Sequence, residues 1–413
     1  MRTNLLEILQ CPFCGSSLTL EPNAALEVRG EEVIGGVLSC QCSAYPIVDG
    51  IPVFTAGYAA ETAIKQLEAG EKEQALFTML ELFDAKQAEF ERLVAKGDGA
   101  IYREAVEILC PDAEGTYFVY RFSDPTYLAG QAIVRAAGSD RRCFAKRAID
   151  LCGGSGHLTR VLSELSGGTE VILADAYFWK LWLARRITAP ACVPVCCDGE
   201  SPLPFRREAF SFAVCSDAFH YIWSKQLLAS EMMRLIDEQG TIVLSHLHNA
   251  LCENFSAGMP LAPQWYRNLF EALGARVFKE SAVLDSLLTR NTVDLSPDYS
   301  DEQLRDEPAL FLIATRLEGL FRRYELSDAR PAARTARINP LYKVERKGED
   351  AVLQLQFPSP DYEEEFGACK RYLPERVELK AGTLRRLAAG EIDGALRELA
   401  ENYVLLDVPK GYL

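Results

Sequence analysis

The sequence predicts an α/β protein whose central domain is a doubly wound parallel sheet, with a small domain on either side. Three observations support this fold class. A strand–turn–helix–strand pattern occupies residues 148–175, apolar runs and helical patterns then alternate to about residue 316, and two close cysteine pairs precede both. Alternating strands and helices are typical of a parallel sheet that is covered by helices on both faces.

The first 57 residues contain the two cysteine pairs, Cys11 with Cys14 and Cys40 with Cys42. Four thiolates in two close pairs, separated by a hairpin-sized loop, can converge on one tetrahedral zinc ion without a large core. The alternative is four unrelated free thiols. Because four thiolates leave no open position for water, we expect such a zinc ion to be structural.

The same region has a family resemblance. The segments LLEILQCPFCGSSL and GVLSCQCSAYPIVDGIPVF resemble the zinc-ribbon family of the small activator subunit that partners tRNA, rRNA and release-factor methyltransferases. The resemblance covers roughly the first 55 residues. It implies a small β-rich domain that docks on a methyltransferase, which in this case would belong to the same chain.

Residues 58–129 are predicted to form a helical linker, because apolar residues recur there with helical spacing. Helices that pack between domains are one interpretation, and a lid over a substrate is the other. The aromatic-rich stretch 116–125 lies just before the central domain. It either folds over a bound ligand, with Tyr120, Arg121 and Tyr127 as contacts, or belongs to the core.

The central domain, residues 130–325, is organised around the segment AIDLCGGSGHLTRVLSELSGGTEVILAD. Its first apolar run ends in a glycine cluster at 153–156, a helical pattern follows, and the second apolar run ends in Asp175. Glycine allows a sharp bend and a close approach of the backbone to a ligand. An acid at the tip of the second strand is the usual partner of a ribose diol.

The strands that follow also end in polar residues. Because ligands bind outside the carboxyl ends of parallel strands, we expect these residues to surround one crevice. The residues at the later strand ends are Asp198, Asp217, His220, His246, His248 and Asn249.

This run of segments resembles the class I S-adenosylmethionine-dependent methyltransferases over about residues 130–316. The matching pieces are AIDLCGGSGHLTRVL, VILADAYFWKLWLAR, CDGESPLPF, FAVCSDAFHYI and MMRLIDEQGTIVLSHL. The resemblance implies a Rossmann-like core that binds S-adenosylmethionine. Asp150 and the backbone of Gly154 and Gly156 would then hold the methionine end, while Cys152 occupies the position of the family's first glycine.

By the same resemblance, the remaining cofactor contacts come from the next strand ends. Asp175, followed by Ala176, would take the ribose hydroxyls, and Asp198, followed by Gly199, would reach the adenine amino group. Asp217 would line the side of the cofactor that carries the sulfonium.

Methyl transfer to oxygen also requires the removal of a proton, for which a histidine is suited. We expect His220 to be this base, with His248 as the second choice. A carbon or amine acceptor can react without a protein base.

Residues 326–413 predict a small α+β module, compatible with a winged helix. Because this module lacks a basic run, a protein-interaction or substrate-covering role is favoured over DNA binding. The acidic run at residues 363–365 is expected to be a solvated loop.

The composition narrows the function further. The 413 residues carry a net charge of −15, which disfavours a nucleic-acid partner. No stretch is long and apolar enough to span a membrane, and the N-terminus does not resemble a signal peptide. Thirteen cysteines without a disulfide-framework pattern favour a reducing, cytoplasmic location.

The sequence therefore predicts an S-adenosylmethionine-dependent methyltransferase that acts on a small molecule or a peptide-like metabolite and carries structural zinc. One alternative is a non-catalytic cofactor-binding scaffold that recruits protein partners through the zinc ribbon or the C-terminal module. The other is an rRNA or tRNA methyltransferase.

Overall fold

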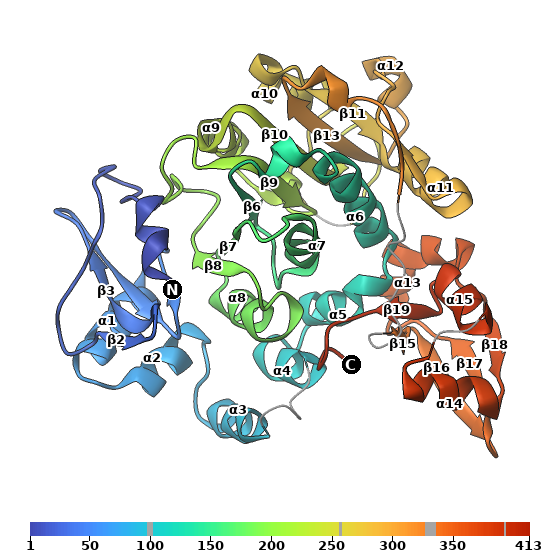
Figure 1. Ribbon diagram of the computed structural model, residues 1–413, viewed down its shortest axis with the longest axis horizontal. Helices are drawn as coiled ribbons and strands as arrows, with labels where there is room; N and C mark the ends of the chain where they lie inside the picture. Colours follow the sequence, from blue (N-terminus) through green and yellow to red (C-terminus); the bar gives the residue numbers. More distant parts are fainter. Residues whose placement is uncertain (97–101, 256–257, 327–335, 392–393) are drawn as a thin grey trace.

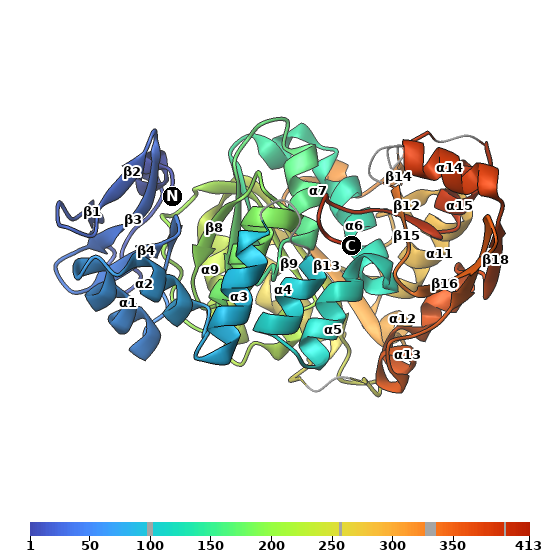
Figure 2. The same ribbon diagram turned by 90° about the horizontal axis from the view of Figure 1, so that it is seen from below.

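The computed structural model describes residues 1–96, 102–255, 258–326, 336–391 and 394–413 (Figure 1). Figure 1 and Figure 2 both show three parts in a row: a β-rich N-terminal part in blue, a central sheet with its helices, and a C-terminal part in red. No helix within these described ranges is long and apolar enough to cross a membrane.

A seven-stranded sheet in the order β11-β13-β10-β9-β6-β7-β8 forms the centre. Strands β6 to β10 pair in parallel, whereas β13 is antiparallel to both of its neighbours. The chain begins in the middle at β6, moves outward through β7 and β8, and returns to the other side of β6 at β9. The order therefore reverses between β6 and β9, which is where open α/β sheets bind their ligands. The strands span Arg147–Leu151 (β6), Val171–Asp175 (β7), Val193–Cys196 (β8), Phe210–Ser216 (β9), Ile236–His248 (β10), Arg276–Lys279 (β11) and Ala309–Thr315 (β13).

Helices cover both faces of this sheet. Since alternate residues of a strand point to opposite faces, each strand contributes to the core on both sides. In β7, Val171 and Leu173 belong to one apolar cluster, whereas Ile172 and Ala174 belong to the other. The predicted doubly wound, Rossmann-like α/β class is thus confirmed. The first cluster includes residues of α6 (Pro125–Gly138), α7 (His157–Leu165), α8 (Phe178–Leu183) and α11 (Glu280–Arg290), and the second includes residues of α9 (Lys225–Leu235), α10 (Pro263–Leu269) and α12 (Asp301–Leu304). A small pair, β12 (Thr292–Asp294) and β14 (Arg323–Glu325), completes this part.

The N-terminal part is an antiparallel sheet that continues onto the edge of the central one. Val53 bridges Cys196 of β8 in parallel, and the Phe54 N–H donates to the Cys196 carbonyl at 2.7 Å. Arg185 adds an ion pair to Glu32 at 2.8 Å. Since β8 is an edge strand, this contact covers backbone groups that would otherwise be unpaired. The strands are β1 (Thr19–Leu20), β2 (Glu27–Arg29), β3 (Glu32–Ser39), β4 (Ala44–Val48) and β5 (Ile51–Pro52).

Helices connect this part to the central sheet, as the sequence predicts. They are α1 (Tyr58–Glu68), α2 (Lys72–Met79), α3 (Ala85–Ala95), α4 (Tyr102–Leu109) and α5 (Ala113–Tyr120). Helix α5 lies against the glycine-rich turn that follows β6, because the Phe118 ring packs on Gly154. The segment 116–125, which the sequence assigns either to a ligand cover or to the core, thus begins within a helix that lies beside this turn.

The C-terminal part is an α+β unit that also reaches the central sheet. The Tyr412 hydroxyl is buried, 2.9 Å from His157 Nε2, and donates to the Phe118 carbonyl. Its strands are β15 (Ala336–Ile338), β16 (Tyr342–Lys347), β17 (Asp350–Leu355), β18 (Arg376–Leu379) and β19 (Leu405–Asp407), with helices α13 (Pro360–Phe366), α14 (Ala381–Ala389) and α15 (Gly394–Glu401). Strands β16, β17 and β18 form one sheet, and β15 pairs with β19.

The acidic run at residues 363–365 lies in α13, so the expectation of a loop is wrong. The Ser359 side chain accepts from the Tyr362 N–H at 3.1 Å, and Pro360 occupies the first helical turn. Both features favour the start of a helix, which is why this acidic run is helical.

Candidate functional site

Three neighbouring strands end in residues with an unusual backbone. Cys152 after β6, Asp217 after β9 and His246 near the end of β10 have φ angles of 54°, 53° and 51°. Residues other than glycine rarely adopt this left-handed conformation, and holding one there costs about 1–3 kcal/mol. Such residues gather at functional sites. Their convergence marks the carboxyl edge of β6, β9 and β10 as the candidate site.

The turn after β6 accepts only glycine at two positions. A Cβ on Gly153 would lie 2.6 Å from the Asp150 carboxyl carbon, and one on Gly154 would lie 2.8 Å from the Phe118 ring. Gly154 also has a φ of 57°. The backbone of this turn therefore lies so close to the Asp150 carboxylate and the Phe118 ring that neither position has room for a side chain.

Asp150 lies fully buried beneath this turn. Its Oδ2 accepts a hydrogen bond from Thr159 at 2.7 Å, whereas Oδ1 has no partner among the described residues. Burial raises the pKa of this carboxyl to about 7, although the Thr159 hydrogen bond opposes the shift. One buried oxygen thus remains available to a ligand.

Asp175 at the end of β7 is held by the backbone around it. Its Oδ2 accepts from the Gly154 N–H and its Oδ1 from the Tyr177 N–H, both at 2.9 Å. Burial raises its pKa, while the nearby Lys180 ammonium opposes the shift. Lys180 is itself buried and pairs with Glu114 at 2.7 Å. No local sequence pattern identifies Lys180, because its closeness to Asp175 depends on where α8 begins.

The loop after β8 lies beside the turn that follows β6. Asp198 is partly exposed, and its Oδ1 accepts from the Glu200 N–H at 2.9 Å. A Cβ on Gly199 would lie 3.3 Å from the Cys152 sulfur. Ala176 is also partly exposed. The structure thus brings the predicted ribose, adenine and glycine-turn positions together.

Two residues near the turn face the core instead. Gly156 precedes α7 with a φ of 83°, and a Cβ there would lie 3.0 Å from the Ala184 side chain. His157 is buried, with its Nε2 at 2.9 Å from the Tyr412 hydroxyl. Both positions are therefore explained by packing.

Asp217 is the centre of a charged network. The Tyr117 hydroxyl donates to it at 2.8 Å, and the Arg121 guanidinium lies at 3.3 Å. Arg121 also pairs with Asp124 at 3.0 Å. Burial favours protonation of Asp217, but the positive charges of His246 and Arg121 hold its pKa below the usual range. Of the three residues considered as lid contacts, Arg121 contacts the site, whereas Tyr127 is buried beside Phe122.

The third, Tyr120, packs edge-to-face against Tyr362 of α13 at 5.6 Å between ring centroids. This contact belongs to the interface between α5 and the C-terminal part.

His246 completes this network from β10. Its Nδ1 lies 2.9 Å from Glu280, and its Nε2 lies 3.9 Å from Asp217. Burial opposes its protonation, but the carboxylates of Glu280 and Asp217 raise the pKa of His246 to about 9. Glu280 begins α11, far from the strand ends in sequence, so no local pattern pointed to it.

The two predicted bases form a stacked pair beside His246. The His220 and His248 rings lie 3.8 Å apart and nearly parallel, at 16°. Burial lowers the pKa of His220 to about 3 and that of His248 to about 4. Both nitrogens of His220 and Nδ1 of His248 have no hydrogen-bond partner among the described residues. Both rings are therefore neutral near pH 7.

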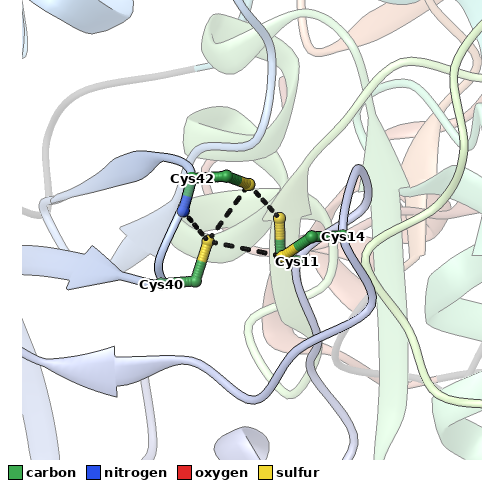
Figure 3. Close-up of side chains that lie close together, drawn as sticks. All are labelled: Cys11, Cys14, Cys40 and Cys42. Atoms are coloured by element: carbon green, nitrogen blue, oxygen red, sulfur yellow. Dashed lines mark hydrogen bonds between the residues drawn. The ribbon is translucent and has the colours of Figure 1, made fainter.

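The four predicted metal ligands also converge. Figure 3 shows the sulfur atoms of Cys11, Cys14, Cys40 and Cys42 turned toward one another. The Cys11–Cys42 and Cys40–Cys42 sulfur distances are 3.5 Å, and Cys14–Cys40 is 3.9 Å. All four sulfurs lie within 4.8 Å of one another.

Comparison with known proteins identifies one family. Residues 148–240 match the family described as "Methyltransferase domain". The chain therefore carries a methyltransferase domain, and the prediction of a methyltransferase is confirmed. No curated protein matches the sequence.

Several solved structures are similar over less than half of this chain. A complex with the Haloferax volcanii Trm112 methyltransferase activator matches at 16% identity, with 44% of this chain and 89% of that chain covered and a TM-score of 0.32. An Aquifex aeolicus SAM-dependent methyltransferase matches at 13%, with 48% and 97% covered and a TM-score of 0.33. Geranyl diphosphate C-methyltransferase from Streptomyces coelicolor matches at 13%, with 42% and 77% covered and a TM-score of 0.30.

The His246 network predicts a pH dependence of stability. Because the folded-state pKa of His246 is about 9 against 6.5 for the free side chain, its stabilising contribution is complete below pH 6.5 and is lost as the pH rises toward 9. The shift corresponds to about 3 kcal/mol. We expect the free energy of unfolding, measured in urea, to fall less between pH 6.5 and 9 in the His246→Gln and Glu280→Gln variants than in the wild type. The Glu271→Gln variant, at an exposed position, should show the same fall as the wild type. Equal slopes in wild type and both network variants would contradict the assignment.

Proposed function

We propose that the protein transfers a methyl group from S-adenosylmethionine to a small molecule or a peptide-like metabolite. The observation that carries this proposal is the convergence of Cys152, Asp217 and His246 at one edge of the sheet. Cys152 and Asp217 lie within the matched methyltransferase domain, and His246 lies six residues after its end. The net charge of −15 supports a metabolite acceptor over RNA.

The residues at the crevice fit the chemistry of this cofactor. Asp150 offers an unpartnered buried oxygen toward the methionine end, and Asp175 and Asp198 offer carboxylates toward the ribose and the adenine. Because Phe118 lies on Gly154, α5 must withdraw before a ligand can use the Gly154 backbone. The covering helix would then exclude water after the cofactor has bound.

We propose that the residues around Asp217 position the methyl acceptor and the sulfonium. The cofactor supplies a methyl group on a sulfonium. The rate of its transfer depends mainly on the alignment of the acceptor atom, the methyl carbon and the sulfur. The negative charge of Asp217 favours the cationic sulfonium nearby. The sequence predicts His220, and as second choice His248, to be the base that takes the proton of the acceptor. Because a pKa near 3 makes His220 a weak proton acceptor at neutral pH, we assign both rings to hydrogen bonding with the acceptor.

The cofactor assignment predicts tight, specific binding of S-adenosylhomocysteine. We expect calorimetry to show one site per chain, and Asp198→Ala to weaken binding about tenfold or more because it removes the predicted adenine contact. Glu238→Ala, an exposed position near the start of β10, is the matched control and should bind normally. An absence of binding to the wild type, or equal affinity in Asp198→Ala, would contradict the assignment. Binding without any turnover in extracts would favour the scaffold alternative.

We also propose that the N-terminal part is a zinc ribbon and that residues 1–57, 58–129, 130–325 and 326–413 are distinct units. Four thiolates about 2.3 Å from a tetrahedral zinc ion lie about 3.8 Å from one another, close to the observed sulfur separations. Such a zinc would tie the two cysteine loops together. The zinc ribbon and the C-terminal module are the surfaces we assign to a protein partner.

The zinc proposal predicts the metal content. We expect mass spectrometry to find one zinc ion per chain, and Cys40→Ser to lose most of it because three thiolates bind more weakly. Cys252→Ser is the control, since Cys252 lies outside the cluster. Zinc-free wild-type protein, or full occupancy in Cys40→Ser, would rule out this site.

A further inference from the structure

The glycine turn after β6 is covered in this structure. A Cβ on Gly154 would lie 2.8 Å from the Phe118 ring, and the Gly154 N–H donates to Asp175 at 2.9 Å. Asp175 is the residue that we assign to the ribose of the cofactor. A ligand that uses this turn must therefore displace the Phe118 ring, so any contact that holds Phe118 in place opposes the entry of the ligand.

Tyr412 of the C-terminal part holds the backbone of Phe118. Residues 409–413 lie beside α4 and α5 (Figure 1), and the Tyr412 side chain is buried. Its hydroxyl donates to the Phe118 carbonyl and lies 2.9 Å from Nε2 of His157. Because a hydroxyl has a single hydrogen, which here goes to the carbonyl, the Tyr412 oxygen accepts from the N–H at Nε2 of His157. Tyr412 thus links the covering helix α5 to the start of α7.

The protonation state of His157 agrees with this direction. Burial lowers the pKa of His157 well below its usual value, so the ring is neutral near pH 7 and carries one N–H. The other nitrogen, Nδ1, lies 3.4 Å from the hydroxyl of Ser155, which can donate to it. Since Ser155 belongs to the glycine turn, a chain of hydrogen bonds runs from the turn through His157 and Tyr412 to α5. We call this chain the Tyr412 bridge.

The C-terminal part also contacts α5 and the residues that follow it. The Tyr372 hydroxyl donates to the Ser123 carbonyl at 3.0 Å, and the Ser123 hydroxyl donates to the Asn339 side chain at 3.0 Å. The ring of Phe366 lies 6.0 Å from that of Tyr117. The unit that holds Phe118 thus also holds the start and the end of the segment 117–123, and α5 cannot leave the turn without losing contacts to it.

We propose that the C-terminal part regulates entry of the cofactor by holding α5 over the glycine turn through the Tyr412 bridge. This inference rests on the proposed methyl-transfer function. The structure is the closed form, in which Phe118 lies on Gly154 and the bridge is intact. Opening breaks the hydrogen bond between Tyr412 and Phe118 and exposes both groups to water. Because only the open form admits the ligand, the apparent affinity is lowered in proportion to the fraction of open molecules.

The test measures how fast S-adenosylhomocysteine binds to the full chain. The Trp179 ring lies 5.7 Å from that of Phe118, so tryptophan fluorescence in a stopped-flow instrument follows the displacement of Phe118. The Tyr412→Phe variant loses the hydroxyl but keeps the ring that stacks on Tyr102 at 4.5 Å. We expect it to bind about fivefold faster, because the closed form alone loses a hydrogen bond. Tyr58→Phe, an exposed tyrosine of α1, should bind at the wild-type rate.

A second set of variants separates the bridge from a general loss of packing. Phe118→Ala removes the ring from Gly154 and should speed binding about tenfold or more. In this background Tyr412→Phe should add little, since no ring remains to be held, and a further acceleration of the same size would overturn the proposal. If Tyr412→Phe does not fold, Tyr372→Phe, which loses the hydrogen bond to Ser123, should also bind faster than wild type. An unchanged rate in that variant would then overturn the proposal.

The outcomes separate this inference from the function on which it rests. Absence of S-adenosylhomocysteine binding in both the wild type and Phe118→Ala would overturn the proposed function. Binding at equal rates in the wild type and Tyr412→Phe would overturn the role of the bridge alone. Hydrogen exchange tests the bridge without a ligand: the amides of α5 should exchange faster in Tyr412→Phe than in the wild type, whereas those of α9 should not. Equal protection of α5 in the two proteins would contradict the proposal.

Discussion

The reversal of strand order between β6 and β9 is the constraint on which the site depends. It brings the ends of β6, β9 and β10 together, and each of these ends carries a residue in a strained left-handed conformation. The Asp217 N–H donates to the Ser245 carbonyl at 2.9 Å, which ties the two strand ends to each other. The surrounding sheet holds this strained edge in place, so that Asp217 faces Arg121 on one side and His246 on the other.

The two outer parts of the chain complete this edge in different ways. The N-terminal part extends the central sheet at β8. The helical linker and the C-terminal part meet over the crevice itself, through the contact of Tyr117 with Phe366 and the burial of Tyr412. Closure of the site thus depends on segments that flank the methyltransferase domain in sequence.

The sequence was most informative where function depends on local spacing. The glycine turn, the acids at the strand ends and the cysteine pairs are short patterns, and the structure brings each set together. Glu280 and Lys180 escaped notice because their partners come from distant segments. The histidines show a second limit: His246, His220 and His248 are close neighbours, yet burial and nearby carboxylates give them pKa values from about 3 to about 9. Only packing determines which of them is charged.

We propose that the carboxyl ends of β6, β7 and β8 hold the nucleoside of the cofactor. A crystal structure of the protein with S-adenosylhomocysteine tests it most directly. We expect density for the ligand between the Gly153 turn, Asp175 and Asp198, with the Phe118 ring displaced from Gly154. A fully occupied ligand elsewhere, or an empty crevice with Phe118 still packed on Gly154 at saturating ligand, would contradict it.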